Sequence, residues 1–175
     1  MTRCVIFLFS LLFLSANSSF ANSLTVYFEG ELLAVGCRLS DDDVQKKIYL
    51  SGLRFSSIET LGRSDIQPFQ LDIVDCSEMA LNKTIKITLN TQNSETHNGI
   101  NYLKTTGESN VLLVLTDSKG KELDLNTKID VSTVTESGKG SINTLSFGVY
   151  AQKPFNTRLK TGVFSSTVTF NLDYQ

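Results

Sequence analysis

Three cysteines and one histidine are the residues whose types could bind a metal or form a covalent crosslink. Cys4, Cys37 and Cys76 are far apart in the sequence, and His97 lies in the polar tract NTQNSETHNGIN. A structural zinc site takes four ligands, usually from closely spaced cysteine and histidine pairs. The chain has no such pairs, so no metal and no other cofactor is expected.

The first 21 residues have the pattern of a secretory signal peptide. Arg3 supplies a positive charge, residues 5–14 (VIFLFSLLFL) form an apolar run, and small residues stand at Ser19 and Ala21. Ten apolar residues suit a signal core and are too few to span a bilayer. A retained membrane anchor is the alternative interpretation. Residues 1–21 are expected to be removed and the mature protein to be exported.

Removal of residues 1–21 takes Cys4 away and leaves Cys37 and Cys76. An even number of cysteines in an exported chain favours a disulfide. The two cysteines are 39 positions apart, and the loop-entropy account gives roughly 4 kcal/mol of stabilisation for a loop of that length. A Cys37–Cys76 disulfide is therefore expected.

Carboxylates and serines could in principle do catalysis or bind calcium. Asp41, Asp42 and Asp43 are consecutive, but the glycine and terminal glutamate of an EF-hand loop are missing, so a solvated turn is expected. A hydrolase would need His97 beside a serine, and no serine stands in a G-x-S-x-G elbow. We expect neither an enzyme nor a small-molecule substrate.

Charge also limits the possible partners. The chain has 16 Lys and Arg against 18 Asp and Glu, a net charge of −2, which becomes about −3 when Arg3 is removed. Nucleic acids and anionic membranes attract clustered Lys and Arg, which this chain lacks. No nucleic-acid partner is expected.

The clearest structural element is residues 162–175 (GVFSSTVTFNLDYQ). From Phe164 onward, apolar side chains recur at every second position except Ser166, while Thr, Ser, Asn and Asp occupy the positions between them. Side chains of a strand alternate between its two faces, so this pattern predicts one long, half-buried strand. The apolar face comprises Phe164, Val168, Phe170, Leu172 and Tyr174.

A second alternating stretch occupies residues 22–33 (NSLTVYFEGELL). One face combines apolar side chains with a single glycine, and the opposite face is polar. This stretch is predicted to be extended as well. The apolar face comprises Leu24, Val26, Phe28, Gly30 and Leu32.

The rest of the chain favours short strands joined by polar turns. No segment of ten or more residues has a sustained 3.6-residue apolar period, and residues 52–68 and 90–101 read as loops. Residues 110–116 (NVLLVLT) are continuously apolar, which is typical of a strand buried on both faces. We predict a single all-β sandwich. The remaining strands are expected at residues 45–50, 69–76, 83–89, 128–135 and 142–151.

Taken in order, these features resemble the type 1-like pilin subunits of the chaperone–usher pathway of Gram-negative bacteria. TVYFEGELLAVGC ends at Cys37, and FQLDIVDC ends at Cys76. Residues 110–120 (NVLLVLTDSKG) resemble the central strand and turn of that family, and Tyr174 is the penultimate aromatic residue. The resemblance covers most of residues 22–175.

The resemblance implies an incomplete immunoglobulin-like β-sandwich that lacks its last strand and is completed by a donor strand from another chain. Residues 1–21 are then the signal peptide, residues 22–33 an N-terminal donor-strand extension, and residues 34–175 the pilin domain. Donation of a strand by a chaperone or a pilin is an established form of β-strand addition. The implied partners are a periplasmic chaperone, an outer-membrane usher and neighbouring pilin subunits in a fimbria on the cell surface.

The resemblance also assigns roles to the two alternating stretches. Phe164, Val168, Phe170, Leu172 and Tyr174 become the acceptor groove and chaperone-binding strand, and basic residues of the chaperone hold the terminal carboxylate of Gln175. The apolar face of residues 22–33 becomes the donor. Gly30 would enter where the groove is too shallow for a side chain; a bulge or turn glycine is the alternative.

Several functions remain open at this point. The preferred hypothesis is a structural or adaptor subunit that supports adhesion. A chain-terminating or anchoring subunit is an alternative, although the intact alternation of residues 24–32 argues against it. A tip adhesin would need a separate receptor domain. A self-contained exported β-sandwich that acts as a binding module would fold alone.

Overall fold

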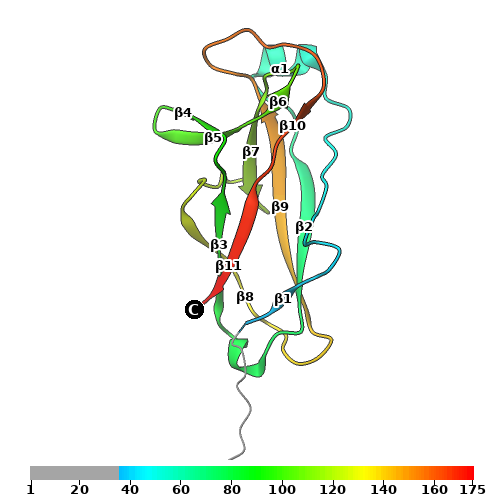
Figure 1. The fold of residues 1–175 in the computed structure, drawn as a ribbon, viewed down its shortest axis with the longest axis vertical. Helices are drawn as coiled ribbons and strands as arrows, with labels where there is room; N and C mark the ends of the chain where they lie inside the picture. The colour runs from blue at the N-terminus through cyan, green and yellow to red at the C-terminus, as the bar shows by residue number, and fades with distance from the viewer. Residues whose placement is uncertain (1–35) are drawn as a thin grey trace, which may run out of the picture. The chain divides into compact units, whose positions relative to one another are not determined.

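The computed structural model describes residues 36–175, which form antiparallel sheets with two short helical segments (Figure 1). The largest sheet has six strands in the order β1-β2-β9-β7-β5-β4. Its strands are β1 (Arg38–Leu39), β2 (Gln67–Val74), β4 (Ser94–His97), β5 (Ile100–Lys104), β7 (Leu112–Asp117) and β9 (Ile142–Gln152).

Two smaller sheets complete the fold. A three-stranded sheet has the order β11-β3-β8, and β10 pairs with β6 in a two-stranded sheet. Their strands are β3 (Thr84–Asn90), β6 (Thr106–Gly107), β8 (Lys128–Thr133), β10 (Phe164–Ser165) and β11 (Thr169–Tyr174). The helical segments are α1 (Phe55–Leu61) and the 3-10 turn η1 (Glu78–Ala80).

The main core lies between the six-stranded and three-stranded sheets. Alternate residues of β2, β9 and β7 contribute to it from one side and alternate residues of β3 from the other. The inward residues Ile85, Ile87 and Leu89 of β3 are all 0% exposed. This arrangement confirms the predicted all-β sandwich and its period-two pattern.

Strand β7 is buried on both faces, as its continuous apolar sequence predicts. Leu113 and Leu115 belong to the main core, whereas Leu112 and Val114 pack into a second cluster with Tyr150 on the outer side of the sheet. The Tyr150 hydroxyl donates to Glu122 at 2.5 Å. Burial, and then this hydrogen bond, raises the pKa of Tyr150 to about 12.

Residues 52–68 contain helix α1, so the prediction of a loop was wrong there. The helix has seven residues, and its C-cap Gly62 has φ 82°, with its N–H donating to the Ile58 carbonyl at 2.9 Å. Ile58 is the only buried residue of α1. A helix that buries one side chain produces no apolar period in the sequence, so periodicity does not predict it.

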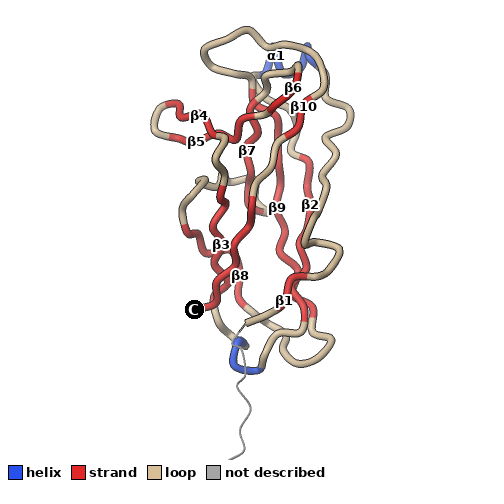
Figure 2. The backbone as a smooth tube through the Cα atoms, viewed as in Figure 1, coloured by secondary structure: helices blue, strands red, loops and turns tan. Residues whose placement is uncertain are grey.

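The predicted strand at residues 45–50 is also wrong. Residues 40–53 form turns and loop without strand pairing (Figure 2). Tyr49 is 78% exposed, and Leu50 packs against the core. The run QKKIYL therefore has no neighbouring strand with which it pairs.

Residues 90–101 contain most of a β-hairpin where a loop was expected. Strands β4 and β5 pair from Ser94 opposite Leu103 to His97 opposite Ile100. The turn residues Asn98 and Gly99 have φ of 49° and 80°. Positive φ at both positions is what a two-residue type I′ turn needs, and Asn-Gly is its usual sequence.

Candidate functional site

Strand β11 carries the C-terminal half of the predicted acceptor surface. It pairs with β3 from Thr169 opposite Asn90 to Tyr174 opposite Ile85, and Gln175 extends the ladder through two backbone hydrogen bonds with Thr84. Within residues 36–175, no strand pairs with the other edge of β11. Backbone N–H and C=O groups on that edge are available to a further strand.

The inward face of β11 is apolar but incompletely covered. Its alternate residues pack against the main core and are half-buried, and the residues between them are exposed. The inward residues of the paired strand β3, by contrast, are fully buried. The sandwich therefore leaves part of its interior open next to β11. The half-buried residues are Phe170, Leu172 and Tyr174.

The final stretch does not form the single long strand that its sequence predicts. β10 pairs with β6, β11 pairs with β3, and residues 166–168 lie between them without strand pairing. In this gap the Ser166 hydroxyl donates to the Lys104 carbonyl at 2.6 Å. The chain changes its partner strand here, yet Phe164 and Val168 keep the inward face and pack half-buried against the core.

Three phenylalanines join the two sheets behind this face. The ring of Phe170 lies 5.4 Å from Phe147 of β9 and 6.3 Å from Phe69 of β2, measured between centroids, and Phe69 and Phe147 are 5.7 Å apart. Phe170 meets the other two rings at steep angles, which suits the quadrupoles of aromatic rings. Phe170 is thus the central apolar contact of β11.

A second set of half-buried apolar residues comes from the segment before α1. Leu39, Leu50 and Leu53 pack against the same core and remain partly exposed. In the part of the chain that the structure describes, β1 is an edge strand of the six-stranded sheet, and β11 is an edge strand of the three-stranded sheet. Each of the two sheets therefore has a free edge that carries incompletely buried apolar side chains.

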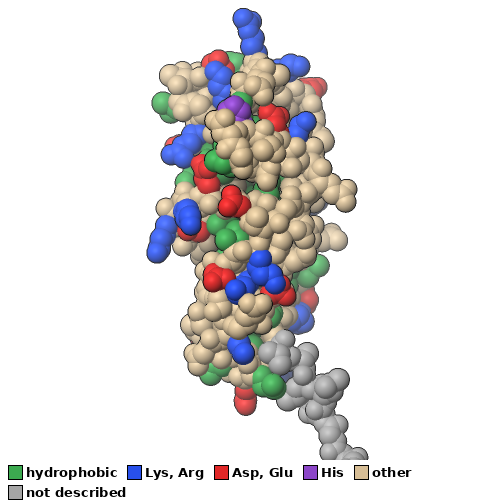
Figure 3. All heavy atoms as spheres, turned by 90° about the vertical axis from the view of Figure 1, so that its left-hand side faces the viewer, with side chains coloured by type: hydrophobic (Ala, Val, Ile, Leu, Met, Phe, Trp, Pro, Cys, Tyr) green, Lys and Arg blue, Asp and Glu red, His purple; other side chains and the backbone are tan. Residues whose placement is uncertain are grey.

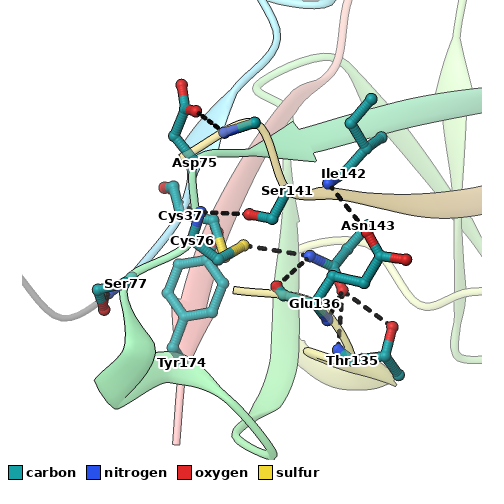
Figure 4. The surroundings of a disulfide bond; sticks show 12 residues. Cys37, Asp75, Cys76, Ser77, Thr135, Glu136, Ser141, Ile142, Asn143 and Tyr174 are labelled. Atoms are coloured by element: carbon teal, nitrogen blue, oxygen red, sulfur yellow. Dashed lines mark hydrogen bonds between the residues drawn. A yellow bond between two sulfur atoms is a disulfide. The ribbon is translucent and has the colours of Figure 1, made fainter. Parts of the chain in front are cut away.

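The predicted disulfide between Cys37 and Cys76 is present beside the end of β11 (Figure 4). The Tyr174 hydroxyl donates to the Cys37 carbonyl at 3.5 Å. A Cβ at Gly36 would lie 3.1 Å from the Tyr174 ring, so this glycine allows the ring to pack on the backbone. Burial raises the pKa of Tyr174. The disulfide thus fixes the first described residues against the last strand.

Asn143 supports the disulfide and was not singled out by the sequence. It is 6% exposed, and its Oδ1 accepts from the backbone N–H groups of Thr135 (2.8 Å) and Glu136 (3.0 Å). Its Nδ2 donates to the Glu136 carbonyl at 2.9 Å and contacts the Cys76 Sγ at 3.2 Å. The sequence does contain a signal for this role, because Asn143 is a polar residue on the face of β9 that is otherwise apolar.

Asp75 holds the turn that leads into Cys76. Its carboxylate accepts from the Gly140 N–H at 2.8 Å and from Arg38 Nη2 at 3.2 Å. The Gly140 N–H, followed by the Arg38 guanidinium, lowers the pKa of Asp75. The Asp75 carboxylate thus links β1, through Arg38, to the turn before β9, through Gly140.

The expected acidic turn is present at residues 41–45, with Asp41 and Asp42 exposed, but Asp43 is buried. Asp43 is 7% exposed, and its carboxylate accepts hydrogen bonds from the Asp72 N–H at 2.6 Å and from the Lys46 ammonium group. Burial raises the pKa of Asp43, but the bonds from Lys46 and Asp72 outweigh it, so the pKa lies below its usual value. Asp43 ties residues 40–46 to β2.

The single histidine lies in β4, away from any metal-binding arrangement. Its ring stacks on Phe155 with 3.8 Å between centroids. Within residues 36–175, His, Cys, Asp and Glu side chains nowhere gather in a group able to hold a metal ion. On the face seen in Figure 3, Lys and Arg side chains are interspersed with Asp and Glu. Over the same residues, none of the helical segments has the length and apolarity of a membrane span.

The donor residues Leu24, Val26, Phe28, Gly30 and Leu32 lie outside the described residues, as do the predicted signal peptide and its cleavage site. The structure brings together the acceptor residues Phe164, Val168, Phe170, Leu172 and Tyr174 on one half-buried face. Their roles in binding remain predictions.

Comparison of the sequence with known proteins identifies the family of this chain. The sequence profile described as fimbrial protein matches residues 26–175. The chain is 24% identical to KS71A fimbrillin of Escherichia coli, over 86% of this chain and 83% of that protein. It is 25% identical to the major MR/P fimbria protein of Proteus mirabilis with the same coverage. It is 27% identical to the type 1 fimbrial subunit of Klebsiella pneumoniae, over 91% and 88%.

Solved structures share the fold. The P pilus rod subunit PapA superimposes with a TM-score of 0.64 at 20% identity, over 81% of this chain and all of that chain. A subunit from the structure of a chaperone–usher pilus superimposes with a TM-score of 0.66 at 22% identity, over 89% and 97%. The predicted incomplete immunoglobulin-like sandwich is confirmed, and the chain belongs to the fimbrial protein family.

Proposed function

We propose that this chain is a structural or adaptor subunit of a bacterial surface fimbria, assembled head to tail by donor-strand exchange and supporting adhesion. The observation that carries the proposal is the free edge of β11 together with its half-buried apolar face. A strand needs both backbone partners and apolar pockets to add to a sheet, and this edge offers both. The proposal assigns no catalysis to the chain.

The N-terminal extension of another copy has the composition that this edge requires. Leu24, Val26, Phe28 and Leu32 fall on one face of an extended segment. Burial of four such side chains, at about 1.5–3 kcal/mol each, gives a gross stabilisation of roughly 6–12 kcal/mol. Main-chain hydrogen bonds add to this figure, and the entropy of ordering the extension subtracts from it.

The incomplete core also explains a need for a periplasmic chaperone. An exposed strand edge beside apolar side chains favours aggregation. A chaperone that lends a strand to β11 covers both until the subunit reaches an outer-membrane usher. The extension of the next subunit then replaces the chaperone strand. An extension on one subunit and a groove on the next make a heterologous contact, which builds an open fibre.

Deletion of Asn22–Glu31 from the mature chain tests the donor role. The variant keeps all of residues 36–175, so it should be captured by the chaperone at the level of the unaltered subunit. It should fail to join the groove of a following subunit, which is measured as loss of multimers in a fimbrial preparation. Normal multimers from this variant would contradict the proposal.

A self-complemented subunit tests the acceptor role separately. Residues 22–33 are removed from the N-terminus and placed after Gln175 through a short flexible linker. This chain should be a monomer with a markedly higher Tm than the mature subunit freed from its chaperone. An equal Tm for the two proteins would instead favour the self-contained sandwich, whose core needs no added strand.

The chain-terminating alternative differs in one measurable outcome. A terminator cannot donate its extension, so it would occupy only one end of a fibre. The proposed subunit should be found within fibres, joined to neighbours on both sides. Immunogold labelling along the length of fimbriae, against labelling at one end, separates the two roles.

A further inference from the structure

We propose that two exposed apolar surfaces at opposite ends of the final stretch, residues 163–175, dock against each other between consecutive subunits of the fibre. The first, here called the η1 surface, consists of Met79 and Leu81. The second, here called the β10 surface, consists of Val163 at the entrance to β10. This inference rests on the donor-strand function proposed above and identifies the partner of each surface as a second copy of this chain.

The η1 surface lies where the N-terminal extension joins the described residues. The Gly36 N–H donates to the Ser77 hydroxyl at 3.3 Å, and the Ser77 N–H donates to the Gly36 carbonyl at 2.9 Å. Ser77 is the N-cap of η1, and Met79 and Leu81 beyond it are 57% and 40% exposed. The space-filling view shows apolar side chains at the surface of this end (Figure 3).

The β10 surface lies at the other end of the final stretch, near α1 and β6 (Figure 1). Val163 is 76% exposed although its backbone is firmly held. Its carbonyl accepts from the N–H groups of Glu108 at 2.9 Å and Ser109 at 3.3 Å. A Cβ at Gly107 would come within 2.4 Å of that carbonyl, so the glycine permits the close approach. The hydrogen bonds to its carbonyl fix the backbone of Val163, so its exposed side chain has a defined position.

The connection between the extension and Gly36 is short, so the η1 surface of one subunit must lie close to the subunit that receives its extension. Only four peptide units separate Leu32, the last predicted donor residue, from Gly36. In any conformation they span at most roughly 14 Å. This is less than the length of β11, which is about 17 Å from its first Cα atom to its last. The body of the donor subunit must therefore contact the acceptor near one end of its groove.

Strand direction selects the end. Every strand pair within residues 36–175 is antiparallel. The last strand of an immunoglobulin-like sandwich is also antiparallel to the strand before it, which is β11 here. An antiparallel donor starts beside Tyr174 and leaves beside Phe164. The lengths are compatible, because residues 24–32 would extend about 27 Å as a strand, and residues 164–174, if fully extended, about 33 Å. The extension thus leaves the groove next to Val163.

The two surfaces consequently meet as donor and acceptor. The η1 surface belongs to the subunit whose extension has been inserted, and the β10 surface belongs to the subunit that received it. A parallel donor would leave beside Tyr174 instead. The η1 surface of the donor would then face the η1 end of its neighbour.

Crosslinking in assembled fimbriae tests both the contact and its direction. Met79→Cys and Val163→Cys are introduced together into the full chain, and fimbriae are treated with a short bis-maleimide crosslinker under non-reducing conditions. A ladder of dimers, trimers and larger species on denaturing gels is expected from the double variant. Each single variant should remain monomeric on the gel. Crosslinked dimers from Met79→Cys alone would overturn the assigned direction, and no ladder from the double variant would overturn the contact.

Charge substitution provides a test without new cysteines. Met79→Lys and Val163→Glu should each lower the amount of fimbrial multimer per chaperone-bound subunit, and the two together should restore it. Single variants that assemble normally, or a double variant that remains impaired, would each contradict the contact. Loss of multimers by deletion of Asn22–Glu31 reports on the donor role alone. Failure of the donor role is therefore distinguishable from failure of this contact.

Discussion

The ring of Phe170 in β11 packs against the ring of Phe147 in β9, with centroids 5.4 Å apart and ring planes at 66°. This contact joins the three-stranded sheet to the six-stranded sheet at the centre of the sandwich. Phe170 is nevertheless only half-buried. The residue that links the two sheets is thus also one that an added strand would cover.

Phe170→Asp should abolish capture by the chaperone. The substitution removes the aromatic contacts with Phe147 and Phe69 and places a carboxylate against the apolar core. Burial of an unpaired charge is strongly unfavourable, and the subunit should be degraded or aggregate. The measurement is the yield of soluble chaperone–subunit complex from the periplasm.

Asn171→Asp is the matched control for this prediction. Asn171 is the next residue of β11 and is exposed on the opposite face. The same carboxylate at this position should leave the yield of complex nearly unchanged. Recovery of the Phe170→Asp complex at the unaltered yield would show that the inward face of β11 does not matter for capture.

Cys37→Ser should lower the amount of subunit in the periplasm. The disulfide closes a separation of 39 residues, and its loss removes roughly 4 kcal/mol in the loop-entropy account. In the self-complemented subunit the same change should lower the Tm by many degrees. Cys76→Ser and the double variant should behave alike, because each lacks the same bond. An unchanged periplasmic level would argue against a stabilising role.

Period-two patterns predicted the strands whose two faces meet different surroundings. In β3, residues at alternate positions are fully buried or half-buried in strict order, and the predicted residues 83–89 nearly coincide with the observed strand. β7 was predicted because both of its faces are apolar. The half-buried face of residues 164–174 was predicted from alternation, as β3 was, although the strand is interrupted.

Pairing between strands could not be predicted in the same way. Periodicity determines which side chains share a face, whereas the neighbour of a strand depends on long-range packing. The change of partner between β10 and β11 at residues 166–168 has no local signal. Helix α1 was not predicted because it buries only Ile58 and so has no apolar period. The β4–β5 hairpin could have been found, since Asn98-Gly99 is a strong turn signal.

Asn143 illustrates a stabilising role that becomes visible only in the folded chain. Asn143→Ala removes the acceptor for the N–H groups of Thr135 and Glu136, and it leaves these groups partly buried without that partner. Each unsatisfied group costs about 1–3 kcal/mol, so the Tm of the self-complemented subunit should fall clearly. Thr144→Ser, at the next and exposed position of β9, is the matched control; it keeps the hydroxyl that donates to Asp72 at 2.6 Å and should have a small effect. Equal Tm values for the two variants would contradict this role.

Asp43 should make the stability of the subunit sensitive to acid. Its pKa in the folded chain lies below the ordinary value of 3.8, because the bonds from Lys46 and Asp72 outweigh the effect of burial. A carboxyl group with a lowered pKa contributes stability that is complete above its unfolded pKa. That stability is lost as the pH falls through the folded pKa. Hydrogen bonds to a charged group contribute about 1.5–3 kcal/mol.

Asp43→Asn tests this contribution in the self-complemented subunit. At pH 7 the variant should have a lower free energy of unfolding, measured by urea titration, because the bond to the Lys46 ammonium loses its charged acceptor. The difference between variant and parent should shrink as the pH falls below 3.8, where the Asp43 carboxylate of the unfolded parent is protonated. Asp42→Asn changes an exposed neighbour in the same turn and should leave the profile of the parent intact. A difference between Asp43→Asn and the parent that stays constant from pH 7 to pH 2 would exclude the carboxylate of Asp43 as the source, since only a titrating group can make that difference depend on pH.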